Sequence, residues 1–458
     1  MNNELLEKYN RPVPRYTSYP PANFFTESFT ETDYRKALAE SNDWEPQNIS
    51  FYFHIPFCRK MCFFCGCNSF PMKKDETVKR YMEAVKKEVE MVKEYIGPGR
   101  KVSQIHYGGG TPNAIPVHYL EELNQLLFDN FSFIEQPEIA IECNPAHLDE
   151  ESVKRLKGAG FRRFSIGIQD FDTNVLKAVN RDPSQLPVDE LIQLLKEGDE
   201  PVDVNLDFIY GLPNQTVDSF IAAIEKAITM KPDRLVTFSY AHVPWVKKSQ
   251  KRLEVIGLPS NEDKIAMFDR ASELLIDSGY HAIGLDHFAL ANDELTIAHK
   301  ERRLHRNFQG YCTRRTTGQV YAFGVSGISQ LEQVYAQNSK SINDYMQQVE
   351  EGHLPIAKGY RLNDDERIVR EVVTEVMCNR QLQWEDMAER CRVSQDTVRQ
   401  AVHYEAAKLD ELQTDGLIQF DNDKIHVTEE GNLFIRNVAA TFDPLMGGDN
   451  ESKFSKPV

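Results

Sequence analysis

The chain has 458 residues, a formal net charge of −17 and an ordinary hydrophobic content of 41%. This length is sufficient for two or three domains, each with its own core. The negative charge argues against a nucleic-acid backbone as the main partner, because phosphate binding requires a basic face.

The start of the sequence and its hydropathy predict a cytosolic protein. Met1–Lys8 has no cationic stretch followed by an apolar core, so we expect no secretory signal. The sequence contains no run of about 18 apolar residues, so we predict no membrane span. We therefore expect the protein to remain in the reducing cytosol without crossing a membrane.

The 8 cysteines are distributed unevenly along the chain. Four lie between Cys58 and Cys67, and such a cluster in a reducing compartment indicates metal or redox chemistry rather than disulfides. For the scattered cysteines we favour small buried apolar residues. These are Cys143, Cys312, Cys378 and Cys391.

From Ile49 to Asp286, short β-rich runs alternate with segments of helical period. Lys74–Ile96 is a clear helix, because its apolar residues recur at spacings of three and four. Alternating strands and helices predict a parallel sheet with right-handed crossovers, here a complete or partial β/α barrel. Chemistry in a barrel occurs at the carboxyl ends of its strands. The strand candidates are Ile49–Ile55, Val102–Tyr107, Glu138–Glu142, Arg162–Ile168, Val202–Ile209, Arg234–Tyr240 and Ala282–Asp286.

The first predicted strand leads directly into a cysteine-rich loop. Cys58, Cys62 and Cys65 have the spacing C-x3-C-x2-C, and Cys67 follows one glycine later. Three thiolates on a short loop can hold three irons of a cubane and leave the fourth iron open to a small molecule. A zinc site would require a second pair of ligands, which is absent. We predict a 4Fe–4S cluster on Cys58, Cys62 and Cys65; zinc, inert thiols and ligation by Cys67 instead of Cys65 are the alternatives.

Three glycines follow the second predicted strand, in the sequence Gly108-Gly109-Gly110-Thr111-Pro112. Glycines at a strand end allow the backbone to approach a ligand closely. A phosphate-binding loop would need a lysine followed by serine or threonine, and neither is present. By itself the pattern is equally compatible with a plain tight turn.

Polar residues also occur where later strands end. They are Glu142, Gln169, Asp207 and Tyr240-Ala241-His242, with Arg181 in the loop after the fourth strand. Each one alone could be a solvated or capping residue, and Arg181 could form an exposed salt bridge. Because barrel strands share one rim at their carboxyl ends, several polar residues there indicate a binding site.

After about Gly359 the pattern changes to helices followed by a hairpin. Arg367–Cys378 and Trp384–Leu412 are predicted helices, and Gly416–Thr428 is a predicted hairpin. This order resembles a winged-helix module. From Gly359 onward there are about 20 acidic against about 12 basic residues, so a duplex would be repelled. We predict a mostly helical, winged-helix-like domain that does not read DNA.

Segments from the whole chain resemble the oxygen-independent coproporphyrinogen III oxidase (dehydrogenase) family of the radical S-adenosylmethionine (SAM) superfamily. The cysteine spacing and the Gly108–Pro112 stretch resemble radical SAM enzymes in general. Pro14–Pro20 and His305–Tyr311 are more specific to the family. The other matching segments are His54–Asn68, Gly167–Asp170, Val179–Arg181, Leu206–Pro213 and Tyr240–His242.

The resemblance implies a reaction, cofactors and partners. The reaction is oxidative decarboxylation of two propionates of coproporphyrinogen III to vinyl groups, which gives protoporphyrinogen IX in haem biosynthesis. The cofactors are a 4Fe–4S cluster and two SAM molecules, whose cleavage gives 5′-deoxyadenosyl radicals. A flavodoxin- or ferredoxin-like electron donor and an electron acceptor are also implied. We expect no nucleic-acid partner, no membrane span and a monomer.

The resemblance also implies site residues. The cluster-bound SAM would contact Tyr52, Gly109, Glu142 and Ile328. The second SAM would contact Phe64, Gly110, Thr111, Gln169, Arg181, Asp207 and Ala241. Catalysis is expected to involve Cys67, Gln309 and Ile328. The chemistry suits these roles, since carboxylates accept from ribose hydroxyls, arginine pairs with a carboxylate and phenylalanine stacks on adenine.

The substrate carries four propionates, so basic or donor groups should line its site. Arg15, Arg306 and Gln309 lie in the most specific segments and are the candidates. We expect residues 1–45 to form an N-terminal segment that contributes to this site, and residues 46–350 to form the radical SAM barrel. Residues 359–458 are expected to cover the barrel mouth.

Three alternatives share much of this pattern: a haem-carrying chaperone, a radical SAM enzyme that degrades haem, and a non-catalytic haem-binding protein with a structural cluster. Cys67 and His305–Tyr311 favour the decarboxylase, because haem-carrying relatives lack the C-G-C sequence and have a different histidine motif. Identification of the reaction product by mass separates all of them.

Overall fold

The largest element of the structure is a sheet of 12 strands. The structure is a computed structural model that describes residues 3–9, 11–198, 200 and 202–446. In spatial order the strands are β16 (Ile356–Arg361), β15 (Val334–Asn338), β14 (Ile328–Gln330), β13 (Gln319–Phe323), β1 (Ile49–Ile55), β4 (Lys101–Gly109), β5 (Ser132–Cys143), β6 (Arg163–Gln169), β7 (Asp203–Tyr210), β8 (Arg234–Ser239), β10 (His287–Leu290) and β9 (Tyr280–Gly284).

The centre of this sheet is parallel and both edges are antiparallel. Strands β13, β1 and β4 to β8 run in one direction. Strands β14 to β16 extend one edge, and β10 and β9 extend the other. Within the described residues no pairing joins β9 to β16. The predicted parallel sheet is confirmed, and all seven strand candidates overlap its strands.

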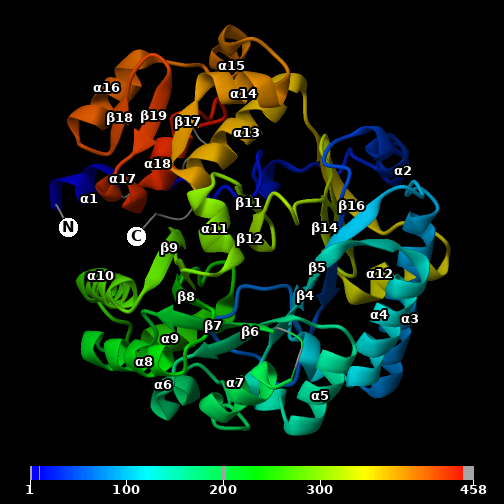
Figure 1. Ribbon diagram of the computed structural model, residues 1–458. Coiled ribbons are helices and arrows are strands. Elements are labelled where there is room, and N and C mark those ends of the chain that lie inside the picture. The colour runs from blue at the N-terminus through cyan, green and yellow to red at the C-terminus, as the bar shows by residue number, and fades with distance from the viewer. Residues whose placement is uncertain (1–2, 10, 199, 201, 447–458) are drawn as a thin grey trace.

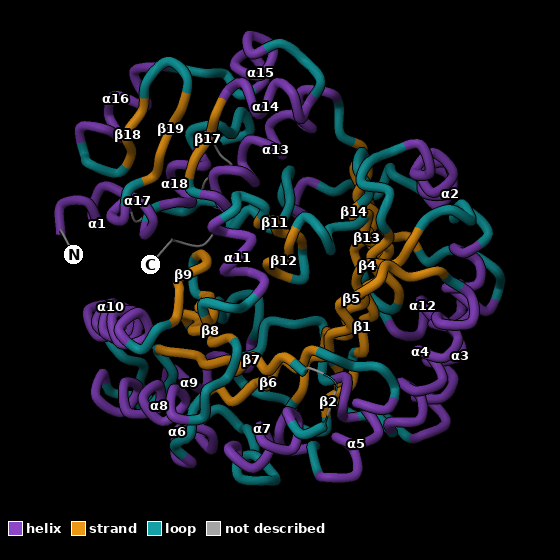
Figure 2. Tube along the Cα trace, viewed as in Figure 1, coloured by secondary structure: helices purple, strands orange, loops and turns teal. Residues whose placement is uncertain are grey.

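Helices cover the outer side of the curved sheet (Figure 1). They are α3 (Asp75–Lys93), α4 (Val117–Asn130), α5 (Glu150–Gly158), α6 (Thr173–Ala178), α7 (Val188–Lys196), α8 (Val217–Thr229), α10 (Asn261–Asp277) and α12 (Ile342–Glu350). Figure 2 shows the strands as an arc with the hairpin of β11 (Leu304–Asn307) and β12 (Gly310–Thr313) on its inner side. The remaining elements of this part are α2 (Glu31–Glu40), α9 (Lys251–Ile256), α11 (Glu294–Lys300) and the 3-10 turns η1 (Ala22–Phe24), η2 (Ser41–Asp43), η3 (Pro112–Ala114), η4 (Pro145–His147) and η5 (Lys248–Gln250).

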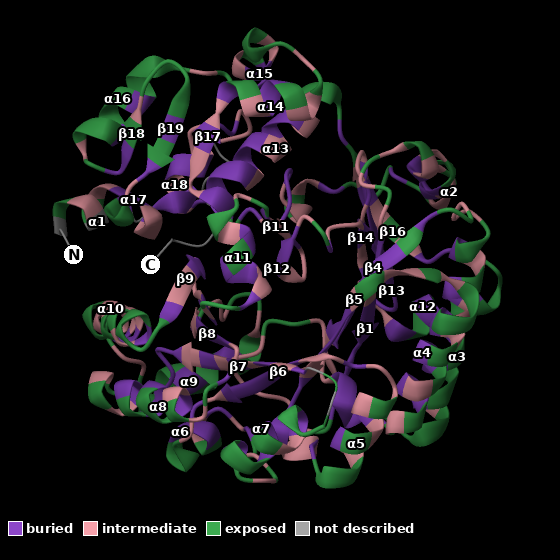
Figure 3. Ribbon diagram, in the orientation of Figure 1, coloured by how far each residue is buried: buried purple, intermediate pink, exposed green. Residues whose placement is uncertain are grey.

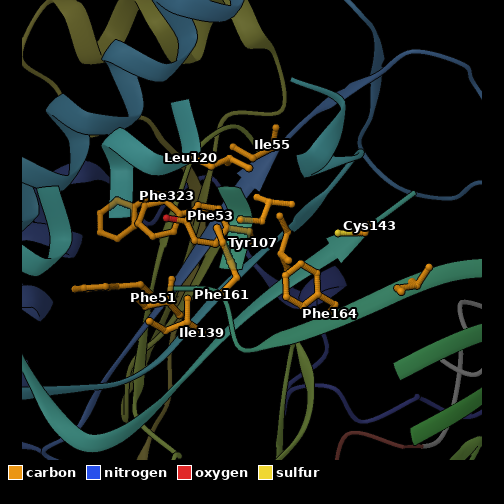
Figure 4. Packing of buried hydrophobic residues seen from close by; sticks show 14 of the residues in the cluster. Phe51, Phe53, Ile55, Tyr107, Leu120, Ile139, Cys143, Phe161, Phe164 and Phe323 are labelled. Atoms are coloured by element: carbon orange, nitrogen blue, oxygen red, sulfur yellow. The ribbon is translucent and has the colours of Figure 1, made fainter. Parts of the chain in front are cut away.

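The two faces of the sheet differ in polarity because side chains alternate along a strand. In β7, Val204, Leu206 and Phe208 are fully buried on the helix side, while Asn205 and Asp207 alternate with them and are only partly buried. The outer face forms one large core in which rings such as Phe51, Phe53 and Phe323 pack together (Figure 4). The inner face is polar, which leaves it available for ligands.

The C-terminal part has a second, separate core. It contains α13 (Asp364–Asn379), β17 (Gln381–Gln383), α14 (Trp384–Cys391), α15 (Gln395–Ala401), α16 (Ala406–Thr414), β18 (Ile418–Phe420), β19 (Lys424–Val427), α17 (Glu429–Leu433) and α18 (Ile435–Ala440). The predicted hairpin is confirmed as β18 and β19, and β17 adds a third strand beside β19. Figure 3 shows that buried residues of this part face inward and exposed residues lie on its outer surface.

The single helix predicted for Trp384–Leu412 is wrong, because three helices occupy this range. Arg392 has a left-handed backbone conformation that ends α14, and the Ser394 side chain then caps α15. His403 also has a positive φ, of 46°, between α15 and α16. The apolar spacing continued across both breaks, so periodicity alone could not detect them.

The N-terminal segment connects the two cores. Tyr9, the last residue of α1 (Asn3–Tyr9), is buried in the C-terminal core, and so are the rings of Tyr16 and Tyr19. Further along, Thr26 pairs with Gly359 of β16 at the edge of the large sheet. Residue 359, the expected start of the C-terminal domain, thus lies inside a strand of the large sheet. Within the described residues, no helix has the length and apolar character needed to cross a membrane.

Candidate functional site

The cysteine loop lies between β1 and α3, at the carboxyl edge of the parallel strands. It is flanked by two short paired strands, β2 (Phe57–Cys58) and β3 (Phe70–Pro71). The loop is fixed to the segment that follows α6. The Phe63 N–H donates to the Val179 carbonyl at 3.0 Å, and the Asn180 side-chain amide donates to the Met61 carbonyl at 2.8 Å.

The glycine stretch after β4 packs directly against this loop. The Gly110 N–H donates to the Ile55 carbonyl at 2.8 Å, and the Thr111 N–H donates to the Phe57 carbonyl at 3.1 Å. A Cβ at Gly110 would lie 2.6 Å from the Pro56 carbonyl carbon, so no side chain fits there. Gly109 has φ +113°, a conformation that other residues rarely adopt. The glycines are therefore required for this approach.

These two loops and the inner face of the sheet enclose a cavity of about 390 Å³. Thirteen of the site residues expected from the sequence line it. They are Cys58, Cys62, Phe64, Cys65, Cys67, Gly109, Gly110, Thr111, Glu142, Gln169, Arg181, Asp207 and Gln309. Residues up to 251 positions apart in the sequence thus converge on one space.

Tyr52, Ala241 and Ile328 were also expected at the site, but they do not line this cavity. The Tyr52 hydroxyl donates to His54 Nδ1 at 3.1 Å, and His54 Nε2 donates to the carbonyl of Asn68 at 2.9 Å. Tyr52 therefore supports the end of the cysteine loop from behind. The Ala241 carbonyl accepts from the Gln250 amide at 3.2 Å, and Ile328 packs in a small apolar cluster on β14.

The substrate candidates occupy both sides of the β11–β12 hairpin. Gln309 lines the cavity beside the cysteines, whereas Arg306 lines a second cavity of about 820 Å³ on the other side. Arg15 lines neither cavity and is exposed. Its backbone carbonyl accepts a hydrogen bond from Arg306 at 3.1 Å.

Two carboxylates in the cavity have opposite protonation tendencies. Burial raises the pKa of Asp207 to about 6, against the lowering effect of a hydrogen bond from the Ser165 hydroxyl at 2.7 Å. Burial acts on Glu142 in the same sense, but its bond from His106 Nε2 at 3.0 Å and the charge of His106 hold its pKa below the ordinary value. Glu142 is therefore an ionised acceptor at neutral pH. Asp207, with its pKa of about 6, titrates close to neutral pH.

The cysteines also differ from one another. Burial raises the pKa of Cys58 and Cys62, although the Arg181 guanidinium opposes this at Cys62, whose Sγ lies 3.5 Å from Arg181 Nη1. A hydrogen bond from Cys67 lowers the pKa of Cys65 to about 6. Cys65 thus becomes a thiolate most readily, and thiolates are the form that binds iron.

The donor set fits a cubane cluster. Three thiolate positions lie on one short loop at a cavity wall, as an iron–sulfur cluster with one open iron requires. Among the described residues, no three His, Cys, Asp or Glu side chains gather closely enough to hold a single metal ion. A cubane does not require such a gathering, because each thiolate binds its own iron.

The remaining cavity wall fits a polar organic ligand such as SAM. Six buried polar atoms of its lining residues have no partner among the described residues: Arg181 Nε, Gln169 Oε1, Asn205 Oδ1, His106 Nδ1, Arg234 Nη1 and Tyr311 Oη. The arginines can donate to a carboxylate, and the amide oxygens can accept from hydroxyl or amino groups. Buried polar atoms normally have partners, so these atoms indicate the place of a ligand or of ordered water.

Several polar residues that line the cavity were not predicted, among them Asn205, Ser165, His106 and His287. Site residues were predicted mainly at the ends of strands, whereas these side chains lie along or beside the inner face. The alternation of polar and apolar residues in β7, DVNLDFIY, was the available signal for Asn205.

Comparisons with known proteins were made for the whole chain. Residues 52–227 match the model described as the radical SAM superfamily, and residues 362–434 match the model described as the HemN C-terminal domain. A Synechocystis protein named oxygen-independent coproporphyrinogen III oxidase is 37% identical over 99% of this chain and 97% of its own length. A Helicobacter pylori protein of the same name is 36% identical over 99% of this chain and 98% of its own.

A solved structure is similar over nearly the entire chain. The coproporphyrinogen III oxidase of Escherichia coli, described as a radical SAM enzyme, superposes with a TM-score of 0.88 at 34% identity. The match covers 97% of this chain and 99% of the E. coli chain. The similarity therefore includes the sheet, the cysteine loop and the C-terminal part.

Substitution of single cysteines tests the ligand set. Cys58→Ala, Cys62→Ala and Cys65→Ala should each lose most of the iron, because each removes one of only three ligands. Cys67→Ala and the buried control Cys143→Ala should retain about four irons per chain. The measurement is iron and acid-labile sulfide in protein purified without oxygen. Full iron in Cys62→Ala, or loss of iron in Cys67→Ala, would contradict the assignment.

Proposed function

The chain belongs to the oxygen-independent coproporphyrinogen III oxidase family of the radical SAM superfamily, and from this membership we propose that it decarboxylates coproporphyrinogen III. Two propionates become vinyl groups, and the product is protoporphyrinogen IX. The observation that carries the proposal is the convergence of Cys58, Cys62 and Cys65 with the Gly109–Thr111 stretch on one cavity. A 4Fe–4S cluster and SAM are the cofactors, and when bound they supply radical abstraction of hydrogen after one-electron cleavage of SAM.

The residues of the chain hold and orient these groups. Cys58, Cys62 and Cys65 supply the thiolates, and Gly109 and Gly110 line the same cavity, where a methionine moiety would lie beside them. Glu142 is an ionised acceptor beside the glycines, since its carboxylate would lie 2.7 Å from a Cβ at Gly108. This side of the cavity is assigned to the cluster-bound SAM.

The second SAM is assigned to the opposite side of the cavity. Gln169, Arg181 and Asp207 line that side, and the first two have buried polar atoms without a protein partner. Arg181 also donates to the Gly167 carbonyl, which fixes its orientation.

A cluster of positive charge near the hairpin supports an acidic substrate. The backbone of residues 13–15 is held by two arginines: Arg436 donates to the carbonyls of Val13 and Pro14, and Arg306 donates to that of Arg15. Burial, followed by repulsion from Arg15 and Arg306, lowers the pKa of Arg436 to about 9. Like charges repel, so this arrangement favours an anionic ligand such as a substrate with four propionates.

These contacts support a separate role for each part of the chain. We assign residues 1–45 to a segment that carries Arg15 to the substrate site, and residues 46–350 to the barrel that holds the cofactors. Of residues 359–458, we assign the part that follows β16, from α13 to α18, to a cover beside the hairpin that does not bind nucleic acid. We assign the enzyme to the cytosol as a monomer, with a separate electron donor and electron acceptor.

The direct test is an anaerobic assay. Protein with a reconstituted cluster is incubated with coproporphyrinogen III, SAM and dithionite, and the tetrapyrroles are identified by mass. We expect loss of two carboxyl groups as carbon dioxide and formation of 5′-deoxyadenosine. An intact tetrapyrrole after SAM cleavage would contradict the proposal, as would a ring-opened product or tight haem binding without turnover.

The positive cluster can be tested through Arg15. Arg15→Gln should raise the KM for coproporphyrinogen III roughly fivefold, the scale of an exposed charge contact, and leave kcat within about twofold. Arg15→Lys should restore part of the loss. Arg11→Gln is the matched control, because Arg11 is also exposed on the N-terminal segment and, among the described residues, its side chain donates only to the Lys8 carbonyl. An unchanged KM in Arg15→Gln would remove Arg15 from the substrate site.

A further inference from the structure

Exposed apolar side chains are concentrated in one short part of the structure, the segment Trp245–Ile256. Among the described residues, four of the seven exposed large hydrophobic side chains lie in it: Trp245 at 77% exposure, Val246 at 65%, Val255 at 89% and Ile256 at 45%. Single exposed apolar residues are common on protein surfaces, but several within one short segment indicate an interaction site. We refer to this segment as the 245–256 segment.

The same segment is strongly basic in an acidic protein. Lys247, Lys248, Lys251 and Arg252 lie in this segment against one acid, Glu254, which pairs with His242. The chain as a whole has a net charge of −17. The side chains of Lys248 and Lys251 are exposed and have no hydrogen bond or ion pair with any described residue. The local charge is therefore opposite to that of the molecule and is directed to solvent.

The 245–256 segment packs on the cysteine loop. Lys247 Nζ donates to the Cys67 carbonyl at 2.8 Å, and the Ser249 hydroxyl donates to the Phe63 carbonyl at 3.2 Å. The Arg252 guanidinium lies 4.7 Å from the centre of the Phe63 ring. The buried Gln250 amide donates to the Phe64 carbonyl at 2.9 Å. A molecule bound to this segment would thus be separated from the cluster loop by one layer of side chains.

We propose that the 245–256 segment is the docking surface for an acidic one-electron carrier protein that reduces the cluster. The inference rests on the proposed function, which requires one electron for each SAM that is cleaved. One electron passes from the reduced carrier to the cluster, so that the carrier is oxidised and the cluster is reduced by one electron each. No bond is formed or broken in this step.

The composition of the segment suits a transient complex of this kind. Electron-transfer encounters bury small interfaces, so a few side chains contribute most of the binding energy. Exposed tryptophan is a frequent centre of such contacts, and surrounding lysines attract an acidic partner and increase the association rate. An anionic membrane is the other surface that basic and apolar residues bind, but α9 has only six residues and lies beside the redox site.

Binding is measured first, with the full chain carrying its oxidised cluster and a purified oxidised bacterial flavodoxin. Interferometry should detect an affinity that falls steeply between about 0.02 M and about 0.3 M salt. Lys248→Glu/Lys251→Glu and Trp245→Ser should each weaken it at least tenfold. The matched control is Lys79→Glu/Lys101→Glu, which changes two exposed lysines at other places by the same charge. Equal binding by the segment variants and the control would overturn the proposal.

Reduction of the reconstituted protein separates this inference from the proposed function. With dithionite, the segment variants should form protoporphyrinogen IX at the wild-type rate within about twofold, because a small reductant needs no docking site. With reduced flavodoxin, kcat/KM for flavodoxin should fall at least tenfold in the segment variants and remain unchanged in the control. Absence of turnover with dithionite in the wild type would refute the proposed function itself. Unchanged flavodoxin kinetics in the segment variants would refute the docking surface. It would also be refuted if the only defect of these variants were a loss of binding to phosphatidylglycerol vesicles.

Discussion

The contact between two neighbouring strands continues beyond their ends, and the candidate site depends on this continuation. β1 and β4 pair in parallel up to Ile55 and Gly109, and the Gly110 N–H then still donates to the Ile55 carbonyl at 2.8 Å. Because Gly110 has no side chain, the peptide of Pro56 can lie against it. The cysteine loop and the glycine stretch therefore start from one point, and their distance is set by backbone hydrogen bonds rather than by flexible side chains.

Much of this arrangement could be predicted from the sequence, for identifiable reasons. The strand candidates overlap observed strands because β-rich runs alternate with helical segments, and the cysteine spacing identified the loop. Polar site residues were predicted mainly at the ends of strands, so the polar inner face was predicted only in part. Strand β13 and the antiparallel strands β14 to β16 were not predicted, because runs such as Ile328–Gln330 are too short to show a period. Tyr52 supports the loop through His54, a contact that no linear pattern contains.

Basic residues gather at two places in this acidic protein. The chain is acidic overall, yet two places near the site are basic: the arginines around residues 13–15 and the 245–256 segment. The first lies beside the hairpin that carries Gln309, where the proposed substrate would bring carboxylates. The second lies on the cysteine loop, where the proposed carrier would bring an acidic surface. Both basic places thus lie where the proposed substrate or the proposed carrier would bring negative charge.

The central claim is that three cysteines hold the cluster and leave one iron for SAM. It can be tested by electron–nuclear double resonance of the reduced protein with SAM that carries ¹⁷O in its carboxylate and ¹⁵N in its amino group. The account predicts hyperfine couplings from both labels in the wild type and in Cys67→Ala. An intact reduced cluster without coupling to either label would contradict it, because SAM would then bind elsewhere than at the open iron.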